Sequence, residues 1–395
     1  MSTTDSSDVI VIGAGVVGAA CAYYAARHGL SVTVLDRGAV AGGTTGAGEG
    51  NLLVSDKEPG PELELALISL ALWRELSEAL PPEIEYEPKG GLVVASAPEG
   101  LPALRKLAAG QRAAGVKAEE IPPERLPGLE PHLAPGLAGG VHYPQDAQVQ
   151  PALAAAHLLR ASGARLRLGE EVTGFLKGAS GELKGVRTSK GALHAPYVVN
   201  AAGAWGGELA RLAGATLPLL PRRGFVLVTE PLPQLVRHKV YSAEYVADVA
   251  SGSAELQTSA VVEGTPAGPV LIGASREQVG FDRSLSTAAL RRLAAQAVAL
   301  FPVLARVRAM RTYAGFRPYL PDHLPAIGHD PTVPGLLHAC GHEGAGIGLA
   351  PATGLVIARL VTGDKPPLDP GPFGPGRFAG ASGTSGTSGR ASTPR

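Results

Sequence analysis

Residues 8–36 read DVIVIGAGVVGAACAYYAARHGLSVTVLD, and this stretch decides the fold. Its β-branched beginning, 8–12, predicts a buried strand, 16–28 predicts a helix, and 31–35 predicts a second strand. A strand, a helix and a strand within about 30 residues form a βαβ unit, whose parallel strands are covered by helices on both faces. The sequence therefore predicts an α/β protein with a Rossmann-like domain.

The first helix follows a glycine motif that is typical of dinucleotide sites. Gly13, Gly15 and Gly18 form GxGxxG, in which they allow a tight turn, approach of the backbone to a pyrophosphate, and close helix–strand packing. Amides at the start of this helix suit phosphates. Asp36 suits a ribose diol and disfavours the 2′-phosphate of NADP. The motif predicts a dinucleotide site, with an ordinary tight turn as the alternative. The residues expected to contact the dinucleotide here are Gly13, Ala14, Gly15, Val16, Val17, Gly18, Asp36 and Arg37.

Three further segments distinguish FAD from NAD. Glycine makes up 53 of 395 residues, about twice its average share, and recurs at 42–50, 199–205 and 341–348. An NAD domain would continue with a plain second βαβ half, whereas glycines at three separated strand ends fit one extended FAD across the sheet. Each segment taken singly is also compatible with an ordinary loop. The residues expected to contact FAD here are Thr44, Thr45, Gly48, Gly50, Asn51, Leu52, Ala201, Ala202, Gly203, Trp205, Gly341, His342, Gly344, Ala345, Gly346, Ile347 and Gly348.

Composition excludes several other classes of protein. The chain has 35 Lys+Arg and 35 Asp+Glu, so it lacks the basic excess that nucleic acid or an anionic membrane attracts. Its two cysteines, Cys21 and Cys340, exclude a disulfide framework and an iron–sulfur cluster held by this chain alone. The N-terminal segment 1–8 carries no Lys or Arg, and glycines interrupt the uncharged run 9–26. We therefore expect a cytoplasmic protein without a transmembrane segment.

The pattern of elements divides the chain into two discontinuous domains. We expect an FAD-binding domain at 1–80, 147–215 and 325–370, and an inserted α+β substrate-binding domain on an antiparallel-rich sheet at 81–146 and 216–324. The segment 371–395 has the composition of a disordered tail. Further helices are expected at 62–80, 101–114, 151–162, 287–300 and 349–361, the last with Pro351 in its first turn. Further strands are expected at 91–95, 171–177, 183–189, 192–194, 197–200, 225–230, 260–262 and 270–274.

Five motifs then carry a family resemblance. They are DVIVIGAGVVG…LDRG, TTGAGEGN, VVNAAGAW, FRPYLPDHLPAIG and GHEGAGIGLAPATG. Over about residues 8 to 365 the chain resembles the D-amino-acid oxidase/glycine oxidase/sarcosine oxidase superfamily of FAD-dependent oxidoreductases. Two stretches, TTGAGEGN and HACGHEGAGIGLAPATG, most resemble the flavoprotein subunits of D-hydroxyproline dehydrogenase, opine oxidase and cyanide-forming glycine dehydrogenase.

The resemblance implies oxidation of the Cα–N bond of a small amino or imino acid, of D-hydroxyproline/D-proline, glycine or opine type, by hydride transfer to flavin N5. As a dehydrogenase, the chain would pass electrons to partner subunits or carriers with iron–sulfur clusters or a second flavin. The alternatives are an amino-acid oxidase that uses O2 and releases hydrogen peroxide, and a flavin-holding subunit without catalysis. An NAD-dependent dehydrogenase that merely shares GxGxxG is a further alternative.

The resemblance also implies roles for single residues. The Arg317-Pro318 step corresponds to the family's Arg-Pro, whose guanidinium pairs bidentately with the substrate carboxylate. Val172 is expected to place its backbone on the adenine. Amides at 346–349 are expected to stabilise the reduced flavin from a helix N-terminus. The alternative for Arg317 is an internal ion pair with Asp322 or another acid.

The remaining candidates have less specific signals. Tyr245 or Tyr241 is a candidate for a carboxylate-binding hydroxyl, and either is equally compatible with ordinary packing. His342 is a candidate catalytic residue, and Asp322 and His323 also lie near the expected flavin face. Each of the three is at least as compatible with a surface or supporting position as with a catalytic one. Arg223 is expected to be structural.

Two cysteine and histidine patterns imitate other sites. His338, Cys340, His342 and Glu343 resemble a metal cluster, but the pattern lacks the i+4 histidine of a zinc-protease helix and glycines interrupt it. We therefore expect no metal. Cys340 lies away from the Arg-Pro region, where sarcosine oxidases carry their flavin-linking cysteine, so we expect non-covalent FAD.

Overall fold

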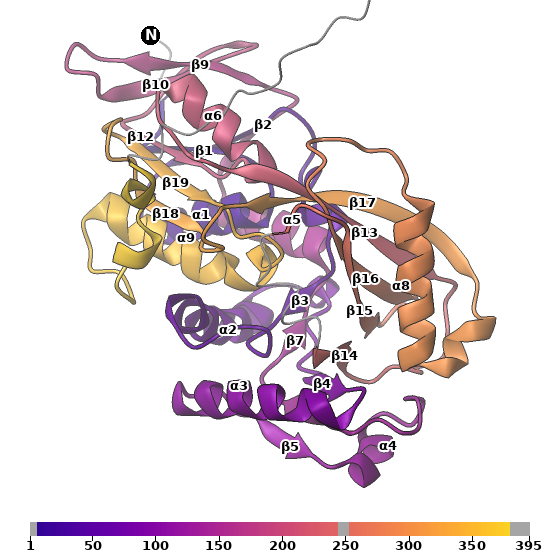
Figure 1. Ribbon diagram of the computed structural model, residues 1–395. Helices are drawn as coiled ribbons and strands as arrows, with labels where there is room; N and C mark the ends of the chain where they lie inside the picture. Colours follow the sequence, from indigo (N-terminus) through magenta and orange to yellow (C-terminus); the bar gives the residue numbers. More distant parts are fainter. Residues whose placement is uncertain (1–5, 244–252, 380–395) are drawn as a thin grey trace, which may run out of the picture.

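A six-stranded sheet in the order β18-β19-β12-β1-β2-β8 contains the predicted βαβ unit (Figure 1). The computed structural model describes residues 6–243 and 253–379. The sheet is parallel except for its edge strand β18. This confirms the Rossmann-like α/β fold. Its strands are β1 (Val9–Ile12), β2 (Val32–Asp36), β8 (Arg165–Leu168), β12 (Tyr197–Asn200), β18 (Ala326–His329) and β19 (Leu336–Cys340).

The two faces of this sheet carry different layers. Val9 and Val11 pack with the helices α1 (Val16–Arg27), α5 (Pro151–Ser162) and α9 (Gly346–Thr362). The alternate side chains Ile10 and Ile12 pack with the layer on the opposite face of the sheet. That layer contains α6 (Gly206–Ala213) and the predicted antiparallel meander of β9 (Val172–Lys177), β10 (Leu183–Thr188) and β11 (Gly191–His194).

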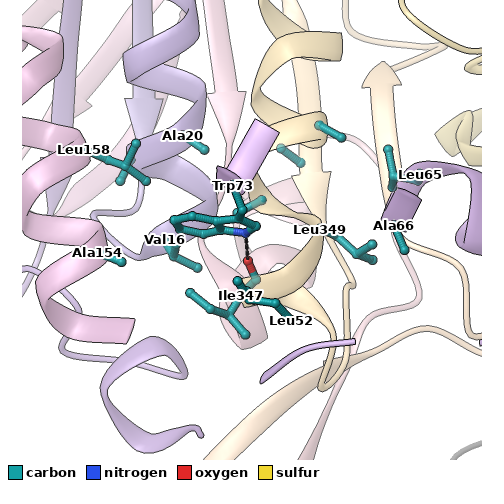
Figure 2. Close-up of a cluster of buried hydrophobic side chains, with 14 of the residues drawn as sticks. Val16, Ala20, Leu52, Leu65, Ala66, Trp73, Ala154, Leu158, Ile347 and Leu349 are labelled. Atoms are coloured by element: carbon teal, nitrogen blue, oxygen red, sulfur yellow. Dashed lines mark hydrogen bonds between the residues drawn. The ribbon is translucent and has the colours of Figure 1, made fainter. Parts of the chain in front are cut away.

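The helix α9 corrects one prediction. It begins at Gly346, three residues before the expected start, so Pro351 lies inside the helix rather than in its first turn. A proline has no N–H, and the carbonyl of Ile347, four residues earlier, therefore loses its helical donor. Trp73 of α2 (Pro61–Ala79) supplies the missing donor, because its Nε1–H donates to this carbonyl at 3.0 Å (Figure 2). Proline is normally tolerated only in the first turn of a helix, and here a side chain from a distant helix compensates for a proline in the helix interior.

A second, eight-stranded sheet has the order β17-β13-β16-β15-β14-β4-β6-β5. Its pairs are antiparallel except β14 with β4, as expected for the substrate-binding part. Side chains of α8 (Thr287–Leu300) pack on one face, and the other face contributes Tyr241 and Val261 to the core shared with α1 and α2. The strands are β4 (Gly91–Ala95), β5 (Glu119–Ile121), β6 (Gly139–Tyr143), β13 (Leu220–Thr229), β14 (Lys239–Ser242), β15 (Gln257–Gly264), β16 (Val270–Arg276) and β17 (Ala309–Tyr319).

Smaller elements complete the fold. They are α3 (Leu101–Ala113), α4 (Leu126–Leu129) and the two-stranded pair of β3 (Asn51–Leu52) with β7 (Ala147–Gln148). Within the described residues, no helix has both the length and the apolar character that crossing a bilayer requires.

The sequence prediction places the start of the disordered tail at residue 371, which is too early. Short 3-10 turns span Gly371–Phe373 and Pro375–Phe378, and the side chains of Phe373 and Phe378 are buried. Arg377 pairs with Asp322 at 2.6 Å. The tail prediction for 371–379 is therefore wrong, because two phenylalanines and one arginine in a Gly/Pro-rich segment find partners in the folded core. The segment 380–395 lies outside the described residues.

Candidate functional site

A cavity of about 540 Å³ lies at the carboxyl ends of the parallel strands. Residues that follow β1, β2, β12 and β19 line it, together with residues of β13 and β17 from the second sheet. Ligands of open α/β sheets bind at this edge. The cavity therefore brings most of the predicted site residues together. They are Gly13, Gly15, Val16, Val17, Asp36, Arg37, Thr44, Thr45, Gly48, Asn51, Val172, Ala201, Ala202, Gly203, Trp205, Arg317, His342, Gly344, Gly346 and Ile347.

The other predicted contacts lie behind or beside this lining. Ala14 and Leu52 are buried in the core, and Ala345 and Gly348 line a small neighbouring cavity with Asn51. Three predicted glycines are each packed so closely that a Cβ would not fit. A Cβ at Gly50 would lie 1.7 Å from the Val149 carbonyl oxygen, and one at Gly18 would lie 1.9 Å from the Gly13 carbonyl oxygen. At Gly341 a Cβ would lie 2.2 Å from Leu320 Cδ1. Tyr245 lies outside the described residues.

The GxGxxG turn has the geometry that its glycines predict. Gly13 has φ of +119°, and a Cβ there would lie 2.3 Å from the Ala201 carbonyl oxygen. Asp36 accepts 2.8 Å hydrogen bonds from the amides of Ala14 and Gly38. The α1 N-terminus, the bare backbone and this acid thus stand together at one end of the cavity. This donor and acceptor set fits the pyrophosphate and ribose of a dinucleotide.

The second glycine-rich segment joins the two sheets. Thr45 Oγ1 accepts a 3.0 Å hydrogen bond from the Val16 amide, and Thr44 Oγ1 donates to the Phe316 carbonyl at 2.6 Å. The segment therefore connects the start of α1 to β17. On the same wall, the Arg37 guanidinium lies 4.7 Å from the ring centre of Trp205.

Arg317 lies on β17 and lines the cavity. Its Nη1 donates to the Ser275 carbonyl at 2.7 Å. Gly224 gives it room, because a Cβ there would lie 2.0 Å from Nη1. Asp322, the alternative partner, pairs with Arg377 instead. The structure thus places a cation at the end of the cavity formed by the second sheet.

Arg222 is a residue that sequence reasoning missed. It is fully buried, and its Nη1 lies 2.7 Å from Glu343 Oε1, whose other oxygen lies 3.0 Å from His323 Nδ1. Burial raises the pKa of Glu343, but hydrogen bonds from His323 and Arg222 bring it below its ordinary value. This pair fixes the loop before α9 to β13. The Arg-Arg step at 222–223 was the available signal; Arg223 itself is structural as predicted, since it pairs with Glu277 and Asp282.

The histidines near α9 have structural partners. Burial lowers the pKa of His342 to about 3, so this ring is neutral, and its Nε2 lies 3.0 Å from Thr353 Oγ1. His338 contacts Asp330 and Asn200. These contacts tie the loop and β19 to their neighbours. In the described part of the chain, no three His, Cys, Asp or Glu side chains are grouped as metal ligands.

The remaining sequence candidates have other positions. Tyr241 is buried, and its hydroxyl donates to Ser55 Oγ in a network with Asp146. Its hydroxyl is therefore engaged in the core. Cys340 lines the cavity, but burial raises its pKa to about 12, so it is a protonated thiol of low reactivity.

Glu49 is the second residue that sequence reasoning missed. It is the one acid in the glycine-rich run 42–50, and it lines the cavity. Burial raises its pKa. A charged side chain within a stretch assigned to backbone contacts was the signal that could have found it.

Comparisons with known proteins find similarity along nearly the whole chain. The family model described as FAD dependent oxidoreductase matches residues 8–360. Hydrogen cyanide synthase subunit HcnC of Pseudomonas aeruginosa is 32% identical over 417 residues, with 94% of this chain and 96% of the relative covered. Glycine oxidase of the same organism is 32% identical over 388 residues, with 94% and 99% covered. The crystal structure of L-proline dehydrogenase from P. horikoshii matches with a TM-score of 0.86 and 26% identity, covering 95% of this chain and 98% of that one.

Proposed function

The chain belongs to the FAD-dependent oxidoreductase family, and from this premise we propose that it oxidises the Cα–N bond of a small amino or imino acid. Bound FAD supplies the hydride acceptor, flavin N5. Relatives named glycine oxidase and L-proline dehydrogenase support a substrate with an amine beside a carboxylate. We propose the D-hydroxyproline/D-proline, glycine or opine type.

We assign the FAD to the cavity at the strand ends. The α1 N-terminus and Asp36 would hold its pyrophosphate and ribose, and the backbone of Val172 would contact its adenine. The amides of 346–349 at the start of α9 would carry the positive end of a helix dipole toward the flavin. In this assignment the six-stranded part binds the cofactor and the eight-stranded part binds the substrate. We further propose that the FAD is bound non-covalently, because the buried Cys340 is a protonated thiol.

One observation carries the proposal: Arg317 lines the same cavity as the glycine turns of the dinucleotide end. A guanidinium there binds the substrate carboxylate and orients the Cα–H. Its hydrogen bond to the Ser275 carbonyl holds it in place.

A panel of amino and imino acids tests this function on the purified holoprotein. At least one member should bleach the flavin band near 450 nm without oxygen, and Arg317→Ala should slow that bleaching. Arg311→Ala is the matched control, because Arg311 lies exposed on the same strand. Failure of every amino and imino acid to bleach the wild-type flavin would overturn the proposal. Unchanged bleaching in Arg317→Ala would overturn the role of Arg317.

For the electron acceptor we propose partner subunits or carriers, so that the chain acts as a dehydrogenase. A relative named as a subunit of hydrogen cyanide synthase supports this choice. The glycine oxidase relative favours the alternative, direct use of O2. Peroxide yield and dye reduction by the purified chain separate the two, because strong peroxide formation without a partner contradicts the dehydrogenase.

The flavin-holding subunit without catalysis is tested in the assembled complex. There, Arg317→Ala should reduce turnover if this chain carries the chemistry. Turnover equal to the wild type would instead assign the reaction to another subunit.

A further inference from the structure

Glu49 has an unusual position for a carboxylate. Its oxygen Oε1 is buried and accepts no hydrogen bond from any of the described residues. Leaving a buried acceptor without a donor costs about 1–3 kcal/mol, and more for a charged group. Because Glu49 lines the cavity, a hydrogen-bond donor that enters the cavity would satisfy this oxygen.

The second sheet makes room for this carboxylate. Gly273 on β16 lies against it, and a Cβ at Gly273 would lie 2.6 Å from both Glu49 oxygens. The carboxylate of Glu49 therefore packs directly against the backbone of Gly273, where a larger residue would displace it. Glu49 thus faces the sheet that carries Arg317, rather than the α1 turn of the dinucleotide end.

The charges around Glu49 come from four strands of that sheet. Lys239 of β14 and Glu263 of β15 form an ion pair at 2.5 Å. Burial is the largest influence on the pKa of Glu49 and raises it, as does Glu263, whereas Lys239, Arg317 and Arg276 oppose this rise. Burial raises the pKa of Tyr313 on β17, and the charge of the nearby Glu49 raises it further. Lys239 already has Glu263 as its carboxylate partner, so an ion pair with Lys239 does not by itself account for the buried carboxylate of Glu49.

We propose that Glu49 receives the amino group of the substrate and accepts the proton that this group loses before oxidation. The proposal rests on the proposed function, because it requires an amino- or imino-acid substrate. Arg317 binds the carboxylate of the zwitterion, and Glu49 binds its ammonium. One N–H bond of the ammonium breaks and one O–H bond forms on Glu49, without any transfer of electrons.

The environment of Glu49 suits this step. A carboxyl group whose pKa is raised by burial is a better base than an exposed one, so its pKa lies closer to that of an ammonium group. Proton transfer between them is then less unfavourable. The neutral amine that results has the lone pair that Cα–H oxidation requires.

The test compares Glu49→Gln with wild-type holoenzyme in two binding measurements. The first follows anaerobic flavin reduction by glycine or D-proline, whichever reduces the wild type. The second follows the flavin absorbance change with acetate or cyclopentanecarboxylate, which keep the carboxylate and lack the amine. We expect at least a tenfold higher Kd for the amino acid and less than a twofold change for its analogue.

The pH profile adds an independent readout. Without Glu49, the enzyme should react only with amine that is already neutral in solution, so the reduction rate constant divided by Kd should rise about tenfold per pH unit. The wild-type profile should be flatter, because Glu49 and the ammonium exchange their proton inside the complex. Lys239, Glu263, Arg276, Arg317 and Tyr313 are unchanged in this comparison.

Two further variants complete the experiment. Gly273→Ala displaces the carboxylate of Glu49. It should therefore also weaken binding of the amino acid while leaving binding of the analogue that lacks the amine unchanged. Glu62→Gln is the matched control, since burial also raises the pKa of Glu62, which lies on α2 beside Lys57. Glu62→Gln should bind the amino acid and its analogue with the wild-type Kd values.

Three results for Glu49→Gln would overturn the proposal. The first is an unchanged Kd for the amino acid, and the second is an equal rise of Kd for the amino acid and its analogue. The third is a loss of bound FAD at equal protein concentration. The last two would assign Glu49 to packing or to the cofactor. If no amino or imino acid reduces the wild-type flavin, the proposed function fails with it, and the wild-type data alone report that outcome.

Discussion

Gly18 shows at the scale of one residue why the sequence motif is so informative. A Cβ on Gly18 would lie 1.9 Å from the Gly13 carbonyl oxygen, and the neighbouring Gly13 has φ of +119°. Both constraints arise within six residues of chain. A pattern of residue types in one short segment therefore specifies the backbone geometry of the turn.

Gly18→Ala should destabilise the protein and reduce its FAD content. The added methyl group meets backbone atoms, and overpacking of this kind costs about 1–3 kcal/mol. Urea unfolding and the FAD-to-protein ratio measure the two effects. Gly128→Ala is the control, because nothing lies within 4 Å of a Cβ at that position. Equal stability of the two variants would contradict the close packing of α1 on the glycine turn.

At the scale of elements, local signals located most helices and left one start wrong. The helix α5 begins at Pro151, where Gln150 accepts from the Leu153 amide, and α8 begins after Ser286, which accepts from the Ala289 amide. Both starts agree with the sequence because their capping partners lie three residues away. The helix α9 instead contains Pro351 in its interior, and the Ile347 carbonyl that this proline leaves without a backbone donor accepts a hydrogen bond from Trp73, 274 residues away. No local rule contains that contact.

Trp73→Phe should lower the free energy of unfolding by about 1–3 kcal/mol, because it leaves the buried Ile347 carbonyl without its donor. Pro351→Ala restores a backbone N–H at the position that bonds this carbonyl in a regular helix. The double variant should therefore lose less stability than the two single variants added together. A double-mutant cycle in urea measures this coupling, and strict additivity would contradict it.

A buried network around Asp146 predicts a pH dependence of stability. Burial raises the pKa of Asp146 to about 7, although Ser55 and the Val54 amide hydrogen-bond to it. The folded protein therefore holds a proton that the unfolded chain has released. Its contribution to stability is complete below the unfolded pKa of about 4 and is lost as the pH rises toward 7.

Asp146→Asn should remove this part of the pH dependence, since an amide does not titrate. Chemical denaturation of wild type and variant at pH 5, 6, 7 and 8 measures the effect. The difference in stability between them should shift in favour of the variant as the pH rises. A constant difference across this range would contradict the raised pKa.

At the scale of the whole molecule, the cavity joins two sheets built from interleaved segments. Loops after β1, β2, β12 and β19 form one part of its lining, and β13 and β17 form another. A ligand that fills the cavity contacts both sheets at once. Its binding free energy therefore adds to the stability of the folded chain.

Removal of FAD should lower Tm, and adding FAD back should restore it. At a free concentration one hundred times Kd, the gain is about 2.7 kcal/mol. Differential scanning calorimetry of the FAD-free protein across a titration measures the shift. Riboflavin is the control, because it lacks the pyrophosphate and adenine that the α1 turn and Val172 are proposed to contact. An equal shift with riboflavin would contradict that assignment.

Four features could be predicted from the amino-acid sequence: the βαβ unit, the glycine turn with Asp36, the antiparallel-rich second sheet and the use of FAD. Each depends on periodicity, capping or bare backbone within short segments, where the chain constrains its own neighbours. Three contacts could not be predicted and are seen only in the folded chain: Trp73 bonds α9, Arg222 pairs with Glu343, and Glu49 lies against Gly273. These contacts join residues far apart in the chain. Burial and charge pairing between such residues depend on which surfaces meet after folding, and that information is absent from any local pattern.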